Sequence, residues 1–293
     1  MSGALADALV KLLASECGLA NSQFTPAQRV ALDDFARKTG AIRLQSQGRG
    51  SLFRVIDRPL AEAHLRQLRP LQGDAVAEDL PIRAANVGMY RNSKGSAAGH
   101  ACQYLLLKSI DQAVRWHDGQ GQEFDLPAIT QLCGAAALAI RSNDGWSSAS
   151  PLWLVENQAL FDDLRWLPAG ACGTLCYYAG QLSGVVLDWL EAKPRASQIV
   201  FFPDYDGIGL QNFARLRERV GDACEFWMIP GWRDLIQCYG NRKIWQDNLA
   251  NYQDAIARLK ALGMQPELAD LCCSLQSSGM ALEQETVFLA FDQ

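Results

Sequence analysis

The chain lacks three features that would decide its class at once: a membrane span, a secretion signal and a set of zinc ligands. No apolar run approaches the ~20 residues of a membrane helix. The first residues carry Asp7 and no basic stretch, so they do not resemble a signal peptide. There are only three histidines, and no second closely spaced cysteine pair completes the one at Cys172 and Cys176. The nine cysteines are therefore expected to be free thiols in a cytoplasmic protein without membrane contact.

The composition is that of a globular protein with an uneven charge distribution. The 293 residues are 49% apolar and 20% charged, enough for two domains, with a net charge of −5. Residues 26–70 hold nine basic and four acidic residues, a local charge of +5, which leaves −10 for the rest. A basic part that grips phosphates and an acidic part that holds metals would give this distribution. An ordinary solvated surface would give it too.

The first 75 residues have the pattern of a small DNA-binding unit. A helix is expected from Pro26, capped by Thr25, to Gly40. Two alternating runs, 41–44 and 51–56, flank a Gly-rich turn and predict a hairpin, and a further helix is expected over 59–68. Three arginines on or near the hairpin are candidate DNA contacts, and the whole is predicted to be a winged-helix-like basic region. These arginines are Arg43, Arg49 and Arg54.

Residues 76–145 are predicted to form a second small α+β module. We expect a helix near 100–109, a hairpin over 114–126 and a helix over 127–140. The turn-rich stretch 143–150 marks a domain boundary. Arg83 and Lys94 are candidates for contacts to a scissile phosphate, with solvated loop charges as the alternative.

Residues 150–293 alternate between strands and helices, which predicts an α/β domain with a four-stranded parallel sheet and flanking helices. The expected strands are 152–155, 173–178, 199–202 and 224–229, separated by helices over 158–164, 182–191 and 210–220. The tail from 244 to 275 reads as helices.

Three carboxylates follow these strands. Asp204 and Asp206 come after the third, where Gly207 and Gly209 permit a tight turn, and Glu156 ends the first. Carboxyl ends of parallel strands share one edge of a sheet, so the three side chains can converge. Clustered carboxylates favour a hard cation, Mg²⁺ or Mn²⁺. Ordinary turn residues, and a helix cap at Glu156, are the alternatives.

The motifs Leu-Val-Glu-Asn at 154–157 and Pro-Asp-Tyr-Asp-Gly-Ile-Gly at 203–209 resemble a Toprim domain. The segment Leu-Glu-Gln-Glu at 282–285 is similar to the closing "EQE" segment of the Toprim nucleases JetD (Wadjet) and MksG. This resemblance implies that Glu156, Asp204 and Asp206 bind metal and that Glu283 and Glu285 are added ligands or acid–base groups. Tyr90 to Lys94 is weakly similar to a Gly-Asp-Ser-Lys segment of that family, with Asn in place of Asp.

The resemblance also implies a function. The chain would be a two-metal DNA endonuclease, the homodimeric nuclease subunit of a condensin-like SMC complex that cuts plasmid or other circular double-stranded DNA. Its partners would be subunits similar to MukB, MukE and MukF. One alternative is similarity to the topoisomerase VI A subunit, which cleaves DNA with a tyrosine, here Tyr90 or Tyr104. Another is a non-catalytic DNA-binding subunit of the same complex.

Overall fold

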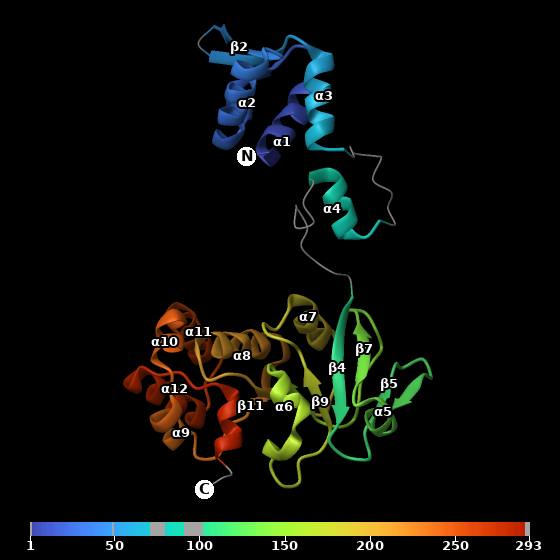
Figure 1. Cartoon of the computed structure of the whole chain (residues 1–293), viewed down its shortest axis with the longest axis vertical. Coiled ribbons are helices and arrows are strands. Elements are labelled where there is room, and N and C mark those ends of the chain that lie inside the picture. Colours follow the sequence, from blue (N-terminus) through green and yellow to red (C-terminus); the bar gives the residue numbers. More distant parts are fainter. Residues whose placement is uncertain (1, 49, 71–79, 91–101, 291–293) are drawn as a thin grey trace. The chain divides into compact units, whose positions relative to one another are not determined.

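The computed structural model describes residues 2–48, 50–70, 80–90 and 102–290, which belong to two compact units, 1–100 and 101–293 (Figure 1). The sequence predicted three segments, 1–75, 76–145 and 150–293. The contacts instead place the division at residue 100, because the strand Gln103–Ser109 pairs with the strand Thr174–Tyr177 in one sheet.

The first unit combines helices with a small antiparallel sheet. Its elements are α1 (Ser2–Leu13), β1 (Leu19–Ala20), the 3-10 turn η1 (Asn21–Gln23), α2 (Pro26–Thr39), β2 (Ile42–Gln47), β3 (Gly50–Val55), α3 (Arg58–Leu68) and α4 (Ile82–Tyr90). The strand order is β1-β3-β2, and α1 packs against α2 and α3. The predicted helix over 26–39 is confirmed with its caps: Thr25 and Gln28 form a capping box, and Gly40 is left-handed at φ 66°.

The second unit is built on a mixed six-stranded sheet. Its strands are β4 (Gln103–Ser109), β7 (Ala136–Ile140), β8 (Leu152–Val155), β9 (Thr174–Tyr177), β10 (Ile199–Phe202) and β11 (Cys224–Phe226), in the order β11-β10-β8-β9-β4-β7. The four predicted strands all form and pair in parallel. The prediction of a four-stranded sheet was incomplete, because β4 and β7 extend it with antiparallel pairs.

Two predicted helices were wrong, since 100–109 and 127–140 contain β4 and β7. In β4 the buried Leu105 and Leu107 alternate with the exposed Tyr104 and Leu106, which is the period of a strand. The second helix forms only as α5 (Leu126–Cys133), because Gly134 ends it in the left-handed conformation at φ 82°.

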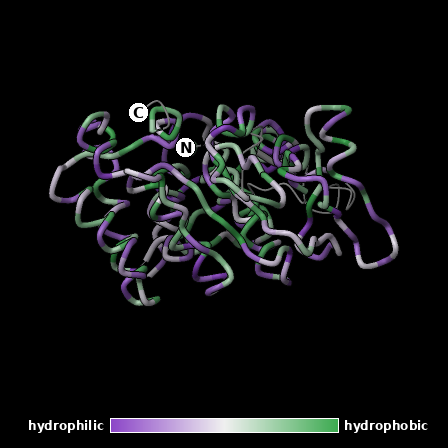
Figure 2. Tube along the Cα trace, turned by 90° about the horizontal axis from the view of Figure 1, so that it is seen from below, coloured by the Kyte–Doolittle hydropathy of each residue, from purple (hydrophilic) through white to green (hydrophobic). Residues whose placement is uncertain are grey.

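Helices cover the sheet. They are α6 (Gln158–Asp162), α7 (Gly184–Ala192), α8 (Gly207–Val220), α9 (Trp232–Tyr239), α10 (Arg242–Asp247), α11 (Leu249–Ala261) and α12 (Pro266–Ser278), with 3-10 turns η3 (Leu164–Trp166), η4 (Gly221–Ala223) and η5 (Gln284–Leu289). The hairpin predicted over 114–126 is present as the antiparallel pair β5 (Arg115–His117) and β6 (Glu123–Asp125). Apolar and polar stretches alternate along the helical parts of the chain in Figure 2, as expected where one helix face is buried.

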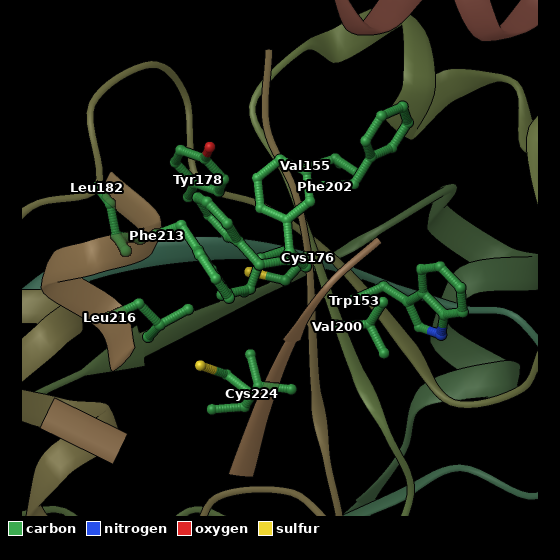
Figure 3. Packing of buried hydrophobic residues seen from close by; sticks show 14 of the residues in the cluster. Trp153, Val155, Cys176, Tyr178, Leu182, Val200, Phe202, Phe213, Leu216 and Cys224 are labelled. Atoms are coloured by element: carbon green, nitrogen blue, oxygen red, sulfur yellow. The ribbon is translucent and has the colours of Figure 1, made fainter. Parts of the chain in front are cut away.

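The central strands are buried on both faces, which fixes their ends in space. Phe201 of β10 stacks between Tyr178 and Phe213 of α8, at centroid distances of 5.9 Å and 6.0 Å. On the opposite face Trp153 packs edge-on against Trp166 at 5.9 Å. Figure 3 shows Tyr178 and Phe213 on one side of the strands and Trp153 on the other. Because β8 and β10 are held from both sides, the residues that follow them start from rigid positions.

In the part of the chain that the structure describes, no helix is long and apolar enough to cross a membrane.

The first turn of α8 is closely packed against the start of α11, and we predict that Gly207→Ala destabilises the protein. A Cβ there would lie 2.1 Å from the carbonyl oxygen of Asn248 and 2.7 Å from the amide nitrogen of Tyr252. An exposed Gly→Ala change inside a helix gains up to about 1 kcal/mol. Here the clash should instead cost about 2 kcal/mol in urea unfolding.

The matched control is Gly184→Ala at the start of α7, where nothing lies within 4 Å of the added Cβ. This variant should unfold at or slightly above the wild-type urea concentration. Equal midpoints for Gly207→Ala and wild type would contradict the packing described for α8.

Candidate metal centre

The loop after β10 is anchored by a tyrosine between its two aspartates. Tyr205 is fully buried, its hydroxyl donates to the carbonyl oxygen of Trp227 at 3.1 Å, and it accepts from the amide of Ile229 at 2.6 Å. The Asp-Tyr-Asp segment is therefore tied to the chain that follows β11, and Asp204 and Asp206 are held on either side of a fixed residue.

Asp206 begins α8, which starts three residues earlier than predicted. Its Oδ1 accepts from the amide of Gly209 at 2.8 Å, and its Oδ2 accepts from the side-chain amide of Asn248, also at 2.8 Å. Only 6% of Asp206 is exposed. Gly209, which we expected in a turn, lies in the first helical turn, where a Cβ would meet the Asp204 carbonyl oxygen at 2.0 Å.

Glu156 leaves β8 next to Asn157, and the alternative that Glu156 caps the following helix was wrong. The cap of α6 is Asn157, whose Oδ1 accepts from the amide of Ala159 at 2.9 Å. The Glu156 carboxylate accepts a hydrogen bond from the Tyr178 hydroxyl at 3.3 Å instead. Because β8 and β10 are adjacent in the sheet, Glu156 and the aspartates follow neighbouring strands.

A distant segment, residues 281–285, completes this edge of the sheet. Leu282 exchanges two backbone hydrogen bonds with Tyr205, of 2.7 Å and 3.1 Å. Beyond it Gln284 is wholly buried, and its amide donates to Oδ1 of Asp204 at 2.8 Å. The carboxylate of Glu285 accepts from the side-chain amide of Asn157.

Of the five predicted acidic residues, four contribute through their charges to the pKa values at this site. Burial, followed by the nearby Asp206 and Glu285 carboxylates, raises the pKa of Glu156 to about 7. Burial and the same cluster raise the pKa of Asp204 to about 7, against the hydrogen bond from Gln284. Burial also raises the pKa of Asp206. The fifth, Glu283, has an exposed side chain and is not among the charges that shift these pKa values.

Each of these four carboxylates is held by a neutral donor. Tyr178 donates to Glu156, the Gln284 amide to Asp204, Asn248 to Asp206 and Asn157 to Glu285. Within the described residues, none of the ion pairs with lysine, arginine or histidine involves any of the four. Among those residues, the carboxylates of the cluster therefore have neutral partners in place of ion pairs.

The donor set fits a hard, hydrated cation. Across residues 2–48, 50–70, 80–90 and 102–290, no three His, Cys, Asp or Glu side chains stand close enough to enclose an ion. Closed cages of that kind are typical of structural zinc, whereas Mg²⁺ takes one or two carboxylates and keeps several waters. Asp204 with Glu156 or Asp206 could hold Mg²⁺ or Mn²⁺ in this way.

The predicted DNA contacts lie in the first unit. Arg43 of β2 and Arg54 of β3 are direct partners in the antiparallel pair, and both are exposed. Arg83 is exposed on α4. Arg49 and Lys94 lie outside the described residues.

Four residues of the site were missed by sequence reasoning: Asn157, Tyr178, Asn248 and Gln284. Asn157 and Gln284 are sequence neighbours of the predicted glutamates, and Tyr178 ends a predicted strand. Their positions in the sequence could therefore have indicated that they lie at the site. Asn248 offered no such indication, because it reaches Asp206 across 42 residues of sequence.

Searches against known protein families and against curated proteins found no match to this chain. Its function is inferred from the residues of this site.

We predict that the site destabilises the metal-free protein at high pH and that Asp204→Asn relieves this. Unfolded Asp has a pKa of about 3.9, and Asp204 in the folded protein titrates at about 7. Between these values the folded state binds more protons, so the free energy of unfolding falls as pH rises through that window. At pH 8 the variant should be more stable than wild type by up to about 4 kcal/mol, with no gain at pH 4.

Urea unfolding in EDTA at both pH values measures this difference. The control is Glu267→Gln, an exposed carboxylate in the first turn of α12, which should keep the wild-type pH dependence. Saturating Mg²⁺ should stabilise wild type at pH 8 more than Asp204→Asn. If the stability of Asp204→Asn depended on pH as that of wild type does, the raised pKa of Asp204 would not be the cause of the loss of stability at high pH.

Proposed function

We propose that the chain is a Mg²⁺- or Mn²⁺-dependent DNA endonuclease. The observation that carries the proposal is the cluster of Glu156, Asp204, Asp206 and Glu285, held by neutral donors at the carboxyl ends of β8 and β10. A site that concentrates negative charge and, among the described residues, forms no ion pair with a basic side chain is suited to hydrated divalent ions. Such ions in turn bind phosphodiester oxygens.

The resemblance to Toprim domains supports this proposal. A glutamate follows the first parallel strand, and an Asp-x-Asp follows the third, which lies next to the first in the sheet. The Glu-Gln-Glu segment lies beside them, joined through Leu282 to Tyr205. This combination of a βα sheet and acidic motifs is the basis for assigning the finer fold, a Toprim domain, to residues 150–293.

The roles proposed for the residues follow from their contacts. Asp204 with Glu156 or Asp206 would hold the cation, and the remaining carboxylates, Glu285 among them, would add negative charge nearby. When bound, the cation would supply charge neutralisation and a water activated for attack on phosphorus. The chain itself fixes the carboxylates: α8 begins on Asp206, and the Gln284 amide holds Asp204.

The first unit supports binding to the DNA backbone. Its order of helix, strand, helix and hairpin, with β1 paired to β3, supports the proposal of a winged-helix-like unit. Arg43 and Arg54 face each other directly, an arrangement that costs stability unless an anion lies between or near them. Phosphates would satisfy this requirement without base-specific reading.

The same resemblance extends the proposal to the biological setting. The substrate would be circular double-stranded DNA, and the chain would act as a homodimer with a condensin-like SMC complex of the MukB type. A tyrosine nucleophile has weaker support: Tyr104 is 70% exposed but lies on β4, and the side chain of Tyr90 lies outside the described residues.

We predict that the protein nicks or linearises supercoiled plasmid in Mg²⁺ or Mn²⁺ and that Asp204→Asn reduces the rate at least about 100-fold, because the cation loses a charged ligand. Gel assays of cleavage, with calorimetry of Mn²⁺ binding, measure both effects. Glu267→Gln, remote from the four carboxylates, should match wild type in both.

Equal cleavage by wild type and Asp204→Asn would refute the metal site. Metal binding without any cleavage, in the presence of long and short circular DNA, would favour a non-catalytic subunit. A covalent protein–DNA adduct that disappears in Tyr104→Phe would favour the tyrosine mechanism.

We also predict that Arg43→Ala with Arg54→Ala weakens binding to duplex DNA. Each lost phosphate contact should lower the slope of log K against log salt by about 1, so the double variant should lose about 2. Fluorescence anisotropy over a range of NaCl concentrations measures the slope. The control is Arg219→Ala, which already pairs with Asp188 and Glu191. An unchanged slope in the double variant would remove these arginines from the DNA contact.

A further inference from the structure

We propose that Gln284 is a positioning residue that holds the two acidic loops of the site in register. The inference rests on the proposed function, since it concerns the geometry of the same carboxylates. Gln284 lies between the two glutamates that the sequence singled out, yet it is the only one of the three that is completely buried.

Its polar groups each have a partner at the site. The backbone amide donates to Asp204 at 2.8 Å. The side-chain Oε1 accepts from the amide of Asn157 at 3.0 Å, and Nε2 donates to the carbonyl oxygen of Phe202 at 3.4 Å. A buried amide costs free energy unless its hydrogen bonds are made, so this side chain is confined to one arrangement.

These partners belong to the loops that carry the acids. Asn157 follows Glu156 directly, and Phe202 is the last residue of β10, two residues before Asp204. The backbone ladder between the strands reaches only the pair Phe202 and Val155. Gln284 joins Phe202 of that last pair to Asn157, two residues beyond Val155, where the ladder between β8 and β10 has ended.

Asn157, which bonds to Gln284, also holds Glu285 in position. Asn157 donates its backbone amide to Gln284 and its side-chain amide to Glu285, while its Oδ1 caps α6. One asparagine thus connects Glu156, Gln284 and Glu285. An apolar residue of equal volume could fill the space of Gln284 but could not set this register, so the amide has a role beyond packing.

The test compares Gln284→Met, which keeps the volume and removes the side-chain hydrogen bonds, with Gln284→Glu, which keeps an acceptor for Asn157. Residues that orient metal ligands typically change affinity or activity 10–100-fold. Gln284→Met should weaken Mn²⁺ binding about 10-fold and lower kcat for plasmid cleavage at least about 10-fold, with KM for DNA unchanged. Gln284→Glu should recover part of the Mn²⁺ affinity.

The matched control is Thr286→Val in the same segment. Thr286 donates to the carbonyl oxygen of Glu283 in an exposed hydrogen bond, so this variant should keep the wild-type affinity and kcat. Hydrogen exchange gives a readout that needs no metal: the Asn157 amide should exchange faster in Gln284→Met than in wild type or Thr286→Val.

The outcomes separate this inference from the proposed function. Wild type that binds no Mn²⁺ and cleaves no DNA would refute the function. Wild type that binds Mn²⁺, together with Gln284→Met of equal affinity, equal kcat and equal exchange at Asn157, would refute only the positioning role. Losses in Gln284→Met that also appear in Thr286→Val would refute it as well, because they would reflect the stability of the segment.

Discussion

The arrangement of the acidic site depends on two backbone hydrogen bonds, those that join Tyr205 to Leu282. Tyr205 is in turn fixed by its buried hydroxyl, which bonds to Trp227 and Ile229 beyond the edge strand β11. Through this chain of contacts a segment near residue 282 is brought to the carboxyl end of β10. Gln284 and Glu285 then lie beside loops from which the sequence separates them by 80 residues or more. The sheet positions Glu156, Asp204 and Asp206 at one edge, and the backbone pair of Tyr205 and Leu282 brings Gln284 and Glu285 to the same edge.

The electrostatics of the site follow from the choice of partners. The carboxylates accept hydrogen bonds from a tyrosine, two side-chain amides and two backbone amides, all of them neutral. Neutral donors orient a carboxylate without cancelling its charge, whereas an arginine in their place would have neutralised it. Elsewhere in the same unit, acids pair with arginines in the ordinary way, as Glu218 does with Arg258. Among the described residues, the cluster therefore differs from these ion pairs in that its hydrogen-bond donors are neutral.

Much of the second unit could be predicted from local pattern. Each of the four parallel strands is a short apolar run that ends at turn residues. Each can therefore be recognised from a few neighbouring positions in the sequence. The strand β4 was missed because Leu105, Leu106 and Leu107 are as apolar as a buried helix, and only its pairing with β9 and β7 shows that the segment is a strand. Glu156, Asp204 and Asp206 could be found because topology alone brings strand ends together. The role of Gln284 could not, since a hydrogen bond spanning 127 residues leaves no local trace.

The order of the chain also has a consequence for how the protein is made. Glu156 and the aspartates leave the ribosome well before residue 285, and the sheet that carries them can form as soon as β11 has emerged. Until residues 281–285 follow, Asp204 lacks the Gln284 amide, and Glu285 is missing from the cluster. A growing chain thus holds the unit in an incomplete form until residues 281–285 have been made, so the acidic centre is assembled after the sheet that carries it.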